Sequence, residues 1–178
     1  FWIGTTSGGV ILYNGFSLRH FTEEQGFSSK WVTSILEDSK GNLWFGTFGD
    51  GAISYDGEQF VRFSEKEGLS DNMVEALFED RHGDIWIGTE RGGACRWNGN
   101  SLTRYTAGEG LADNSVQSIS EDSTGKLWFG TRKGISSYDS EEFRSYTVAG
   151  LPWRYPVSSM LLDSSGDLWI GTNGGGVL

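Results

Sequence analysis

A four-residue phrase that occurs five times constrains the fold of this chain more than any other feature. Each copy reads Trp, then Ile or Phe, then Gly-Thr, and the copies begin at Trp2, Trp44, Trp86, Trp128 and Trp169. The tryptophans are separated by 42, 42, 42 and 41 residues, and a period of that size is typical of architectures built by repetition. The 178 residues leave no room beside the repeat, so we expect units at about 1–31, 32–73, 74–115, 116–156 and 157–178.

The composition favours short strands joined by tight turns. The chain has 27 glycines, 2 prolines and 14% aromatic residues, which differs clearly from the composition of a disordered chain. A formal net charge of -10 argues against nucleic acid as a partner, because a phosphate backbone requires a basic surface. Cys95 is the only cysteine, which excludes an internal disulfide, and its small or apolar counterparts in the other units predict a buried thiol.

The chain begins inside the repeated phrase and has no initiator methionine. No apolar run in it approaches the roughly 20 residues that span a bilayer. We therefore expect a fragment of a longer protein, in which any membrane contact is made by segments outside this chain.

The third unit predicts four short strands connected by hairpins. The expected strands are Val74 to Glu79, Ile85 to Thr89, Ala94 to Trp97 and Leu102 to Tyr105. Asn98-Gly99 separates the last two, and this dipeptide is favoured in two-residue hairpins because both residues tolerate positive φ. Strands joined only by hairpins form an antiparallel meander, and no helical period runs long enough to compete.

One such meander cannot bury both of its faces, whereas a ring of them packed face to face can. The predicted fold class is therefore all-β, a β-propeller of four-stranded antiparallel blades, with about four blades present. The repeated Trp is expected to lie as a wedge between neighbouring blades, and the Gly two residues later admits a close neighbour. A small residue follows the first valine of each unit by two positions, as crowding near a central axis requires: Ser34, Ala76, Ser118 and Ser159.

No constellation of catalytic or metal-binding residues stands apart from the repeat. His20 and His82 are expected on the surface, one on an outer strand and the other in a hairpin turn. Asp80 and its counterparts are expected to accept backbone hydrogen bonds within that turn. The glutamates that precede these aspartates recur in register and are assigned to turn architecture rather than to acid-base work: Glu37, Glu79 and Glu121. We therefore predict no catalytic residue, no metal site and no cofactor.

The loops at one end of the strands vary from unit to unit, although the residues that flank them do not. In a meander, the loop between the second and third strands lies on the same face as the long loop between blades. Variation on a fixed frame is how a propeller adapts a binding face. The candidate ligand-binding residues in these loops are Phe48, Asp50, Glu90, Arg91, Arg132, Lys133 and Asn173.

The loop over 150–157 is one residue longer than its counterparts and places Trp153, Arg154 and Tyr155 between two prolines. An aromatic platform, a cation and a hydroxyl suit stacking on a sugar ring or anchoring a protein loop, so these three residues are further candidates. The open alternative is that the two aromatic rings fill a gap between blades. Trp31, in the equivalent loop of an earlier unit, is expected to pack, and the open alternative is a second exposed aromatic residue.

The units over 68–93 and 110–134 carry Gly-Leu, Asn, Glu-Asp, Gly, Trp and Gly-Thr at fixed spacing, and the chain as a whole resembles the two-component regulator propeller repeat. The resemblance implies a ring of seven or eight blades, often paired with a second propeller. It implies a periplasmic or extracellular sensor region of a histidine kinase, hybrid two-component regulator or diguanylate cyclase. It also implies a glycan or another small molecule as the ligand. Virginiamycin lyase-like propellers have a broadly similar repeat.

We expect a ligand-sensing module that does no chemistry and passes its occupancy to a downstream signalling domain by a population shift. The alternatives are a protein-interaction or adhesion propeller and a propeller lyase, whose catalytic groups would lie outside this chain. Open faces at the two ends of the repeat array also predict a homo-oligomer. The family resemblance implies a second propeller as the other possible partner.

Overall fold

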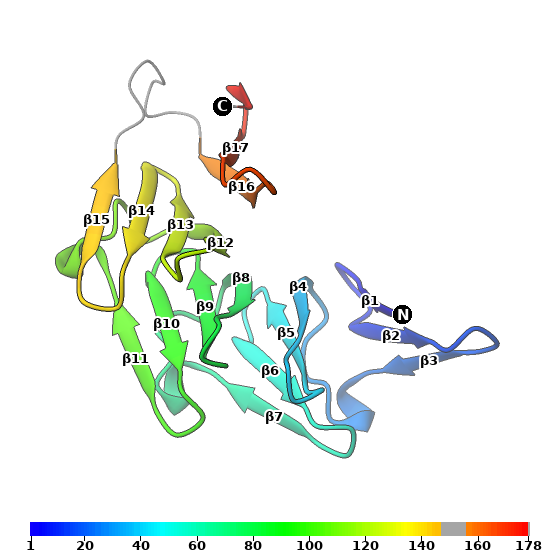
Figure 1. Cartoon of the computed structure of the whole chain (residues 1–178). Coiled ribbons are helices and arrows are strands. Elements are labelled where there is room, and N and C mark those ends of the chain that lie inside the picture. The colour runs from blue at the N-terminus through cyan, green and yellow to red at the C-terminus, as the bar shows by residue number, and fades with distance from the viewer. Residues whose placement is uncertain (147–155, 178) are drawn as a thin grey trace.

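The computed structural model describes residues 1–146 and 156–177, and these residues form five antiparallel sheets. Figure 1 shows the sheets following one another around an open arc, with β4, β8, β12 and β16 at its inner edge. The fold is all-β, as predicted. Three sheets have four strands, whereas the first and last have three within the described residues.

Every sheet is a meander whose spatial order follows the chain. The first sheet contains β1 (Trp2–Gly4), β2 (Val10–Tyr13) and β3 (Leu18–Phe21). The second contains β4 (Val32–Glu37), β5 (Leu43–Thr47), β6 (Ala52–Tyr55) and β7 (Phe60–Phe63). The third contains β8 (Val74–Glu79), β9 (Ile85–Thr89), β10 (Ala94–Trp97) and β11 (Leu102–Tyr105). The fourth contains β12 (Val116–Glu121), β13 (Leu127–Thr131), β14 (Gly134–Tyr138) and β15 (Phe143–Tyr146). The fifth contains β16 (Val157–Leu162), β17 (Leu168–Thr172) and β18 (Gly176–Val177).

The four strands predicted in the third unit are observed with the predicted bounds. The reason given for the Asn98-Gly99 turn was wrong, because Gly99 has a φ of 88° but Asn98 is not in the positive-φ region. The Asn98 side chain instead accepts hydrogen bonds from the backbone N–H groups of Asn100 and Ser101. Asn therefore fixes this turn as an acceptor, and glycine alone supplies the left-handed residue.

Three short 3-10 turns interrupt the loops between blades. They are η1 (Glu23–Gln25), η2 (Glu65–Glu67) and η3 (Ala107–Glu109). Each begins with a capping box; in η2, the Glu67 carboxylate accepts the backbone N–H of Ser64 at 2.9 Å. The sequence signal Ser/Thr-x-x-Glu/Gln was present at all three places, so these turns were predictable although they were not predicted.

A hydrogen bond between an aspartate and a tryptophan ties the first hairpin of a blade to its second strand. Asp80 Oδ1 accepts the backbone N–H groups of His82 and Asp84, as predicted, and its Oδ2 accepts the indole Nε1–H of Trp86 at 2.8 Å. The same indole bond joins Asp38 to Trp44, Asp122 to Trp128 and Asp163 to Trp169. The indole is thereby held in one orientation in four successive blades.

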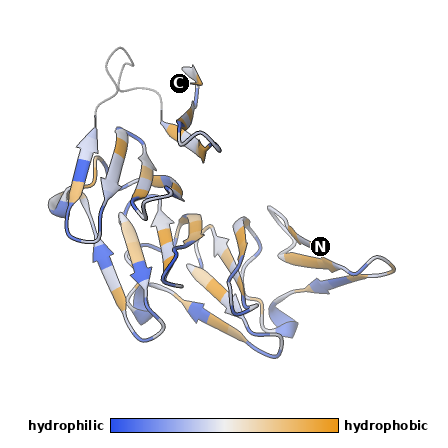
Figure 2. Ribbon diagram, in the orientation of Figure 1, coloured by the Kyte–Doolittle hydropathy of each residue, from blue (hydrophilic) through white to orange (hydrophobic). Residues whose placement is uncertain are grey.

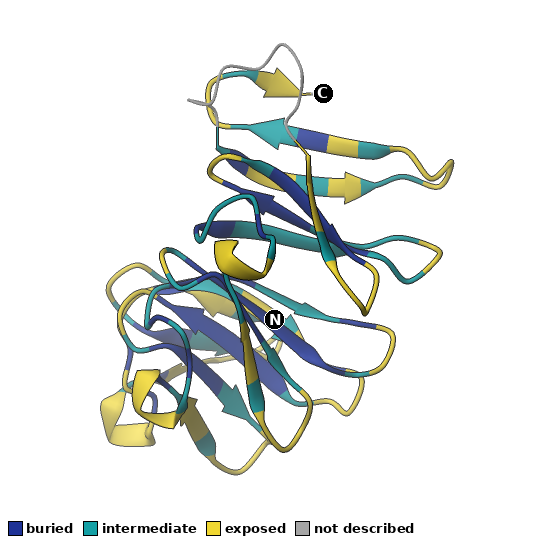
Figure 3. Ribbon diagram, turned by 90° about the vertical axis from the view of Figure 1, so that its left-hand side faces the viewer, coloured by how far each residue is buried: buried dark blue, intermediate teal, exposed yellow. Residues whose placement is uncertain are grey.

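The oriented indole packs between blades, which confirms the predicted wedge. Trp86 is 0% exposed and lies against Phe129 and Tyr138 of the following sheet, with ring centroids 5.3 and 5.5 Å away. Figure 3 shows the buried residues concentrated on the strands, whereas the hairpin tips and 3-10 turns are exposed. Trp169 is 49% exposed, because no described sheet follows the fifth one.

The glycine two residues after Trp86 explains the small residue on the first strand. Gly88 pairs with Ala76 across the sheet, and a Cβ on Gly88 would lie 2.8 Å from Val116 Cγ1 of the next blade and 3.2 Å from Ala76 Cβ. Gly88 therefore has no room for a side chain, and only a small residue stands opposite it. Figure 2 shows the resulting pattern, with apolar residues along the strands and hydrophilic residues at the turns.

Glu79 and Glu121 do belong to the turn architecture, as predicted, but each binds the hairpin turn of the preceding blade rather than its own. The Glu79 carboxylate accepts the backbone N–H and hydroxyl of Ser39, on the hairpin of the preceding blade, at 2.7 and 2.6 Å. Glu121 accepts the backbone N–H and Nε–H of Arg81 in the same way. These glutamates therefore link neighbouring blades, and Leu162 at the equivalent place in the fifth sheet has no carboxylate to form the link.

We expect Trp86→Phe to lower the free energy of unfolding by about 3 kcal/mol, because it empties buried volume and leaves the Oδ2 atom of Asp80 without its donor. Urea denaturation would measure the change. Trp97→Phe is the matched control, since the Trp97 indole is half-buried and makes no hydrogen bond within the described residues; it should cost about 1 kcal/mol. Equal losses in the two variants would contradict a special role for the indole bond.

The same hydrogen bonds predict acid sensitivity at Asp122. Burial raises the pKa of Asp122, but hydrogen bonds from Thr124, Trp128 and the backbone of Lys126 outweigh burial and lower the pKa from 3.8 to about 2. A pKa that is lower in the folded state stabilises the protein above the unfolded value and loses that effect as the pH falls. Stability in urea should therefore decline between about pH 4 and pH 2, and Asp122→Asn should flatten this decline. An unchanged pH dependence in the variant would refute the assignment.

Candidate functional site

Two sets of loops meet at one end of the blades and form what we call the loop face. The loops between the second and third strands donate backbone hydrogen bonds to the loops that enter each blade. These bonds run from Phe48 to Trp31, from Glu90 to Met73, from Arg132 to Ser115 and from Asn173 to Pro156, with N···O distances of 3.0, 2.9, 3.1 and 2.9 Å. The predicted sharing of one face is confirmed, and the same backbone frame recurs at four places with different side chains.

An aromatic pair occupies the first of these places. Trp31 and Phe48 are stacked, with ring centroids 4.6 Å apart and an interplanar angle of 29°. They are 44% and 40% exposed. Trp31 does pack, as expected, but one side of the pair faces solvent. No sequence pattern predicted that these two rings, 17 residues apart, would meet.

A cluster of charges occupies the next two places. Arg132 Nη2 donates to Glu90 Oε1 at 2.7 Å across neighbouring blades, and Lys133 Nζ lies 2.8 Å from Asp113 Oδ2. Burial, and then the Glu90 carboxylate, raises the pKa of Glu75 on β8, with Arg132 opposing. Both candidate cations are therefore paired with carboxylates, and a ligand that uses either of them must compete with or bridge an existing ion pair.

The remaining candidates are distributed over the loop face rather than gathered in one cleft. Asp50 forms an ion pair with Arg62 at 3.1 Å, within its own blade. The backbone N–H of Arg91 donates to Asp71 Oδ2 at 2.9 Å. The three candidates in the long loop, Trp153, Arg154 and Tyr155, lie outside the described residues.

The described residues contain no group of three His, Cys, Asp or Glu side chains placed to hold a metal ion. His20 and His82 lie on the surface, as predicted. Cys95 is buried, also as predicted; burial raises the pKa of its thiol, and its Sγ contacts Ser70 Oγ at 3.2 Å. The thiol is therefore a packed side chain rather than a reactive one.

The repeat geometry is that of a known family. A model described as "two component regulator propeller" matches residues 26–49, 68–91, 110–133 and 150–174. The chain belongs to the two-component regulator propeller family. These matches begin at the loop that enters each blade and run through the tryptophan strand, which is the part of the repeat that carries the frame described above.

Among solved structures, this regulator propeller is similar to the extracellular domain of a hybrid two-component system from B. thetaiotaomicron, with 27% identity and a TM-score of 0.82. The match covers 99% of this chain and 25% of that one, so the chain spans about a quarter of its relative. The extracellular domain of a one-component system from the same organism is 24% identical, with a TM-score of 0.76, and the match covers 99% and 27%. No curated protein matches the sequence.

A virginiamycin B lyase from Staphylococcus aureus is also similar in fold, at 19% identity and a TM-score of 0.64, over 78% of this chain and 48% of the lyase. Identity at that level shows the fold alone. Within the described residues, no helix is long and apolar enough to cross a membrane.

We expect the Glu90–Arg132 pair to be weakly coupled in stability, by about 0.5 kcal/mol, because Arg132 is half-exposed and water screens the pair. A double-mutant cycle with Glu90→Ala and Arg132→Ala, followed by urea denaturation, would measure the coupling. Glu142 and Arg144 form the control pair: both side chains are about 60% exposed, and their coupling should be close to zero. Equal coupling energies in the two cycles would mean that the Glu90–Arg132 pair does not stabilise the contact between neighbouring blades.

Proposed function

We propose that this chain is part of an extracytoplasmic ligand-sensing β-propeller of a bacterial signal-transduction protein. Family membership and the likeness to the extracellular domain of a hybrid two-component system support this proposal. The chain would bind a glycan or another small molecule on its loop face and do no chemistry of its own. A propeller lyase is less well supported, because the likeness to the virginiamycin lyase shows only the fold.

The exposed Trp31–Phe48 pair is the observation that carries the proposal. The backbone bond from Phe48 to Trp31 recurs between Glu90 and Met73 and between Arg132 and Ser115, where no aromatic pair is present. The frame therefore does not require aromatic side chains at these positions. Two large rings held open to solvent offer a flat apolar surface of the kind on which a sugar ring stacks.

Polar groups near the pair could fix the orientation of a bound molecule. Asp50 belongs to the same loop as Phe48, and its partner Arg62 lies on the outer strand of that blade. Trp153, Arg154 and Tyr155 would add a second recognition element in a later blade. Binding sites combine apolar surface with a few placed polar groups in this way.

A ligand held by loops of several blades would favour one arrangement of the propeller relative to its neighbours, and this population shift would carry the signal. We propose that the arc belongs to a ring of seven or eight blades. A second propeller or a second copy of the chain is the expected partner. The exposed Trp169, whose counterpart Trp86 is fully buried, supports further packing at that end of the arc.

We expect Trp31→Ala and Phe48→Ala each to weaken binding of the best oligosaccharide in a panel at least tenfold, which corresponds to about 1.4 kcal/mol. Titration calorimetry would measure the affinity. Phe16→Ala is the control, since Phe16 is 97% exposed but lies in a hairpin at the opposite end of the strands. Thermal melting would confirm that each variant folds.

Two outcomes would overturn the proposal. In the first, the unaltered protein binds no member of the panel. In the second, Phe16→Ala weakens binding as much as the two loop-face variants do. Binding to a protein partner that depends on Trp31 and Phe48, without saccharide binding, would establish the interaction propeller instead.

A further inference from the structure

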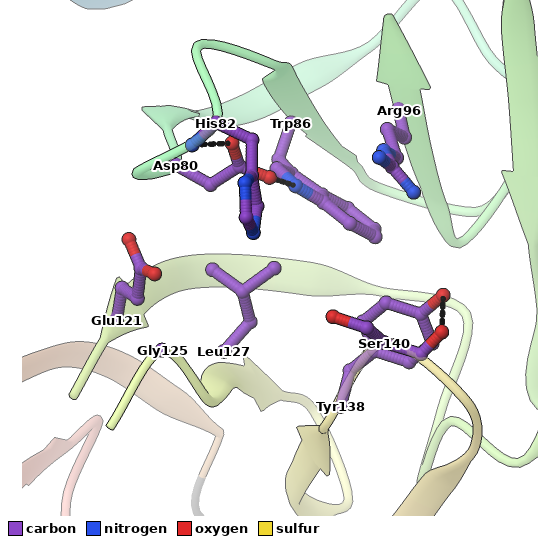
Figure 4. Close-up of a pocket in the computed structure, with 9 residues that line it drawn as sticks. All are labelled: Asp80, His82, Trp86, Arg96, Glu121, Gly125, Leu127, Tyr138 and Ser140. Carbon is purple, nitrogen blue, oxygen red and sulfur yellow. Dashed lines mark hydrogen bonds between the residues drawn. The ribbon is translucent and has the colours of Figure 1, made fainter. Parts of the chain in front are cut away.

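A groove lies between the third and fourth blades at the end opposite the loop face. It has a volume of ≈ 230 Å³, and a second hollow of ≈ 310 Å³ adjoins it and has His82, Gly125 and Ser140 in common with it. Figure 4 shows His82 and Arg96 of the third blade directed toward Leu127 and Tyr138 of the fourth. Hairpins of two blades form the rim, so the groove exists only where these blades pack together.

The acidic groups of the groove are already engaged. Asp80 accepts two backbone N–H groups and the Trp86 indole, as described above. Glu121 is paired with Arg81, and Asp139 accepts the backbone N–H groups of the two residues that close its turn. Asp80 and Asp139 keep their negative charge, but none of the three carboxylates uses the side chain of His82 or Lys126 as a hydrogen-bond donor.

Two of the basic groups are engaged, and two are not. Arg81 donates from Nε to the Glu121 carboxylate and from Nη2 to the backbone carbonyl of Asp122. Arg96 Nε donates to Asp84 Oδ2 at 2.6 Å. The His82 imidazole and the Lys126 ammonium line the same hollow and have no hydrogen-bond or ion-pair partner among the described residues. Although Asp139 also lines this hollow, no carboxylate among the described residues is bonded to the side chain of His82 or Lys126, so the hollow offers two donors that the protein itself does not use.

Ser140 provides an independent sign that the groove departs from the repeat pattern. It has a φ of 78° and is the only non-glycine residue with positive φ in the described part of the chain. Glycine occupies the equivalent turn position in the three preceding blades, at Gly15, Gly57 and Gly99. A strained residue that borders a cavity is a frequent feature of functional sites.

Hydroxyl groups complete the lining near Ser140. Tyr138 donates its hydroxyl hydrogen to the Ser140 carbonyl at 3.2 Å. Burial, and then a hydrogen bond with Tyr105, raises the pKa of Tyr138 to about 12, so the phenol stays neutral. The groove thus combines uncharged hydroxyl groups at one end with the nitrogen donors of His82 and Lys126 at the other.

We propose that this groove binds a small hydroxylated carboxylic acid, with the carboxylate held by His82 and Lys126 and the hydroxyl groups facing Ser140 and Tyr138. The site is separate from the loop face, and either can exist without the other. Other blades do not reproduce it: Ser54 and Ser137 occupy the place of Arg96, and Lys40 and Thr124 that of His82.

Titration of the protein with gluconate and with glucitol tests the proposal, because the two probes differ in the carboxylate and are otherwise alike. We expect gluconate to bind and glucitol to bind at least tenfold more weakly. The double variant His82→Gln, Lys126→Gln should weaken gluconate binding at least tenfold. Both side chains reach the surface, so the variant is expected to fold, and thermal melting would verify this.

Two control variants test whether gluconate binds in the groove rather than elsewhere on the protein. Lys40→Gln alters the hairpin position equivalent to His82 in the second blade, and Trp31→Ala alters the loop face; both should leave gluconate binding unchanged. The proposal is overturned if gluconate and glucitol bind equally, if inorganic sulfate binds as tightly as gluconate, or if the double variant binds as the unaltered protein does.

Discussion

The hydrogen bond from a tryptophan indole to an aspartate six residues earlier is the interaction on which the rest of the structure depends. It joins the first hairpin of a blade to the second strand and fixes the plane of the ring, as in Asp80 and Trp86. An indole without this bond would leave a buried polar group unsatisfied, which is costly in an apolar interface. With it, the ring becomes a rigid wedge against which the next blade can pack.

Blade-to-blade contacts extend from that wedge to both ends of the strands. At the hairpin end, Glu79 and Glu121 bind the preceding turn. Near the axis, Gly88 lets Val116 of the next blade approach closely. At the loop end, the recurring backbone bonds between adjacent loops hold the frame. Because these contacts use the backbone or the repeated residues, the side chains between them are free to differ.

The two candidate sites use side chains that the contacts between blades do not require. The Trp31–Phe48 pair replaces side chains that the loop frame does not need, and the groove with His82 and Lys126 occupies hairpin positions that other blades fill differently. Both sites are therefore local departures from a periodic structure, which is where a repeat protein places its recognition.

The sequence alone determined the period, the strands of each blade, the wedge role of tryptophan and the sharing of one face by two sets of loops. These features depend on local patterns and on spacing, and spacing repeats faithfully from unit to unit. The short 3-10 turns were also encoded locally, by the capping signal, although they were not predicted.

Only the tertiary structure decided which side chains meet across blades. Glu79 reaches a serine 40 residues away, Arg132 is neutralised by Glu90, and Trp31 stacks on Phe48 with one side exposed. Such contacts depend on how closely two sheets pack and on which way a side chain leaves its strand. The period of the repeat brings the blades together, but it does not specify these distances, because they result from packing between units rather than from the pattern within one.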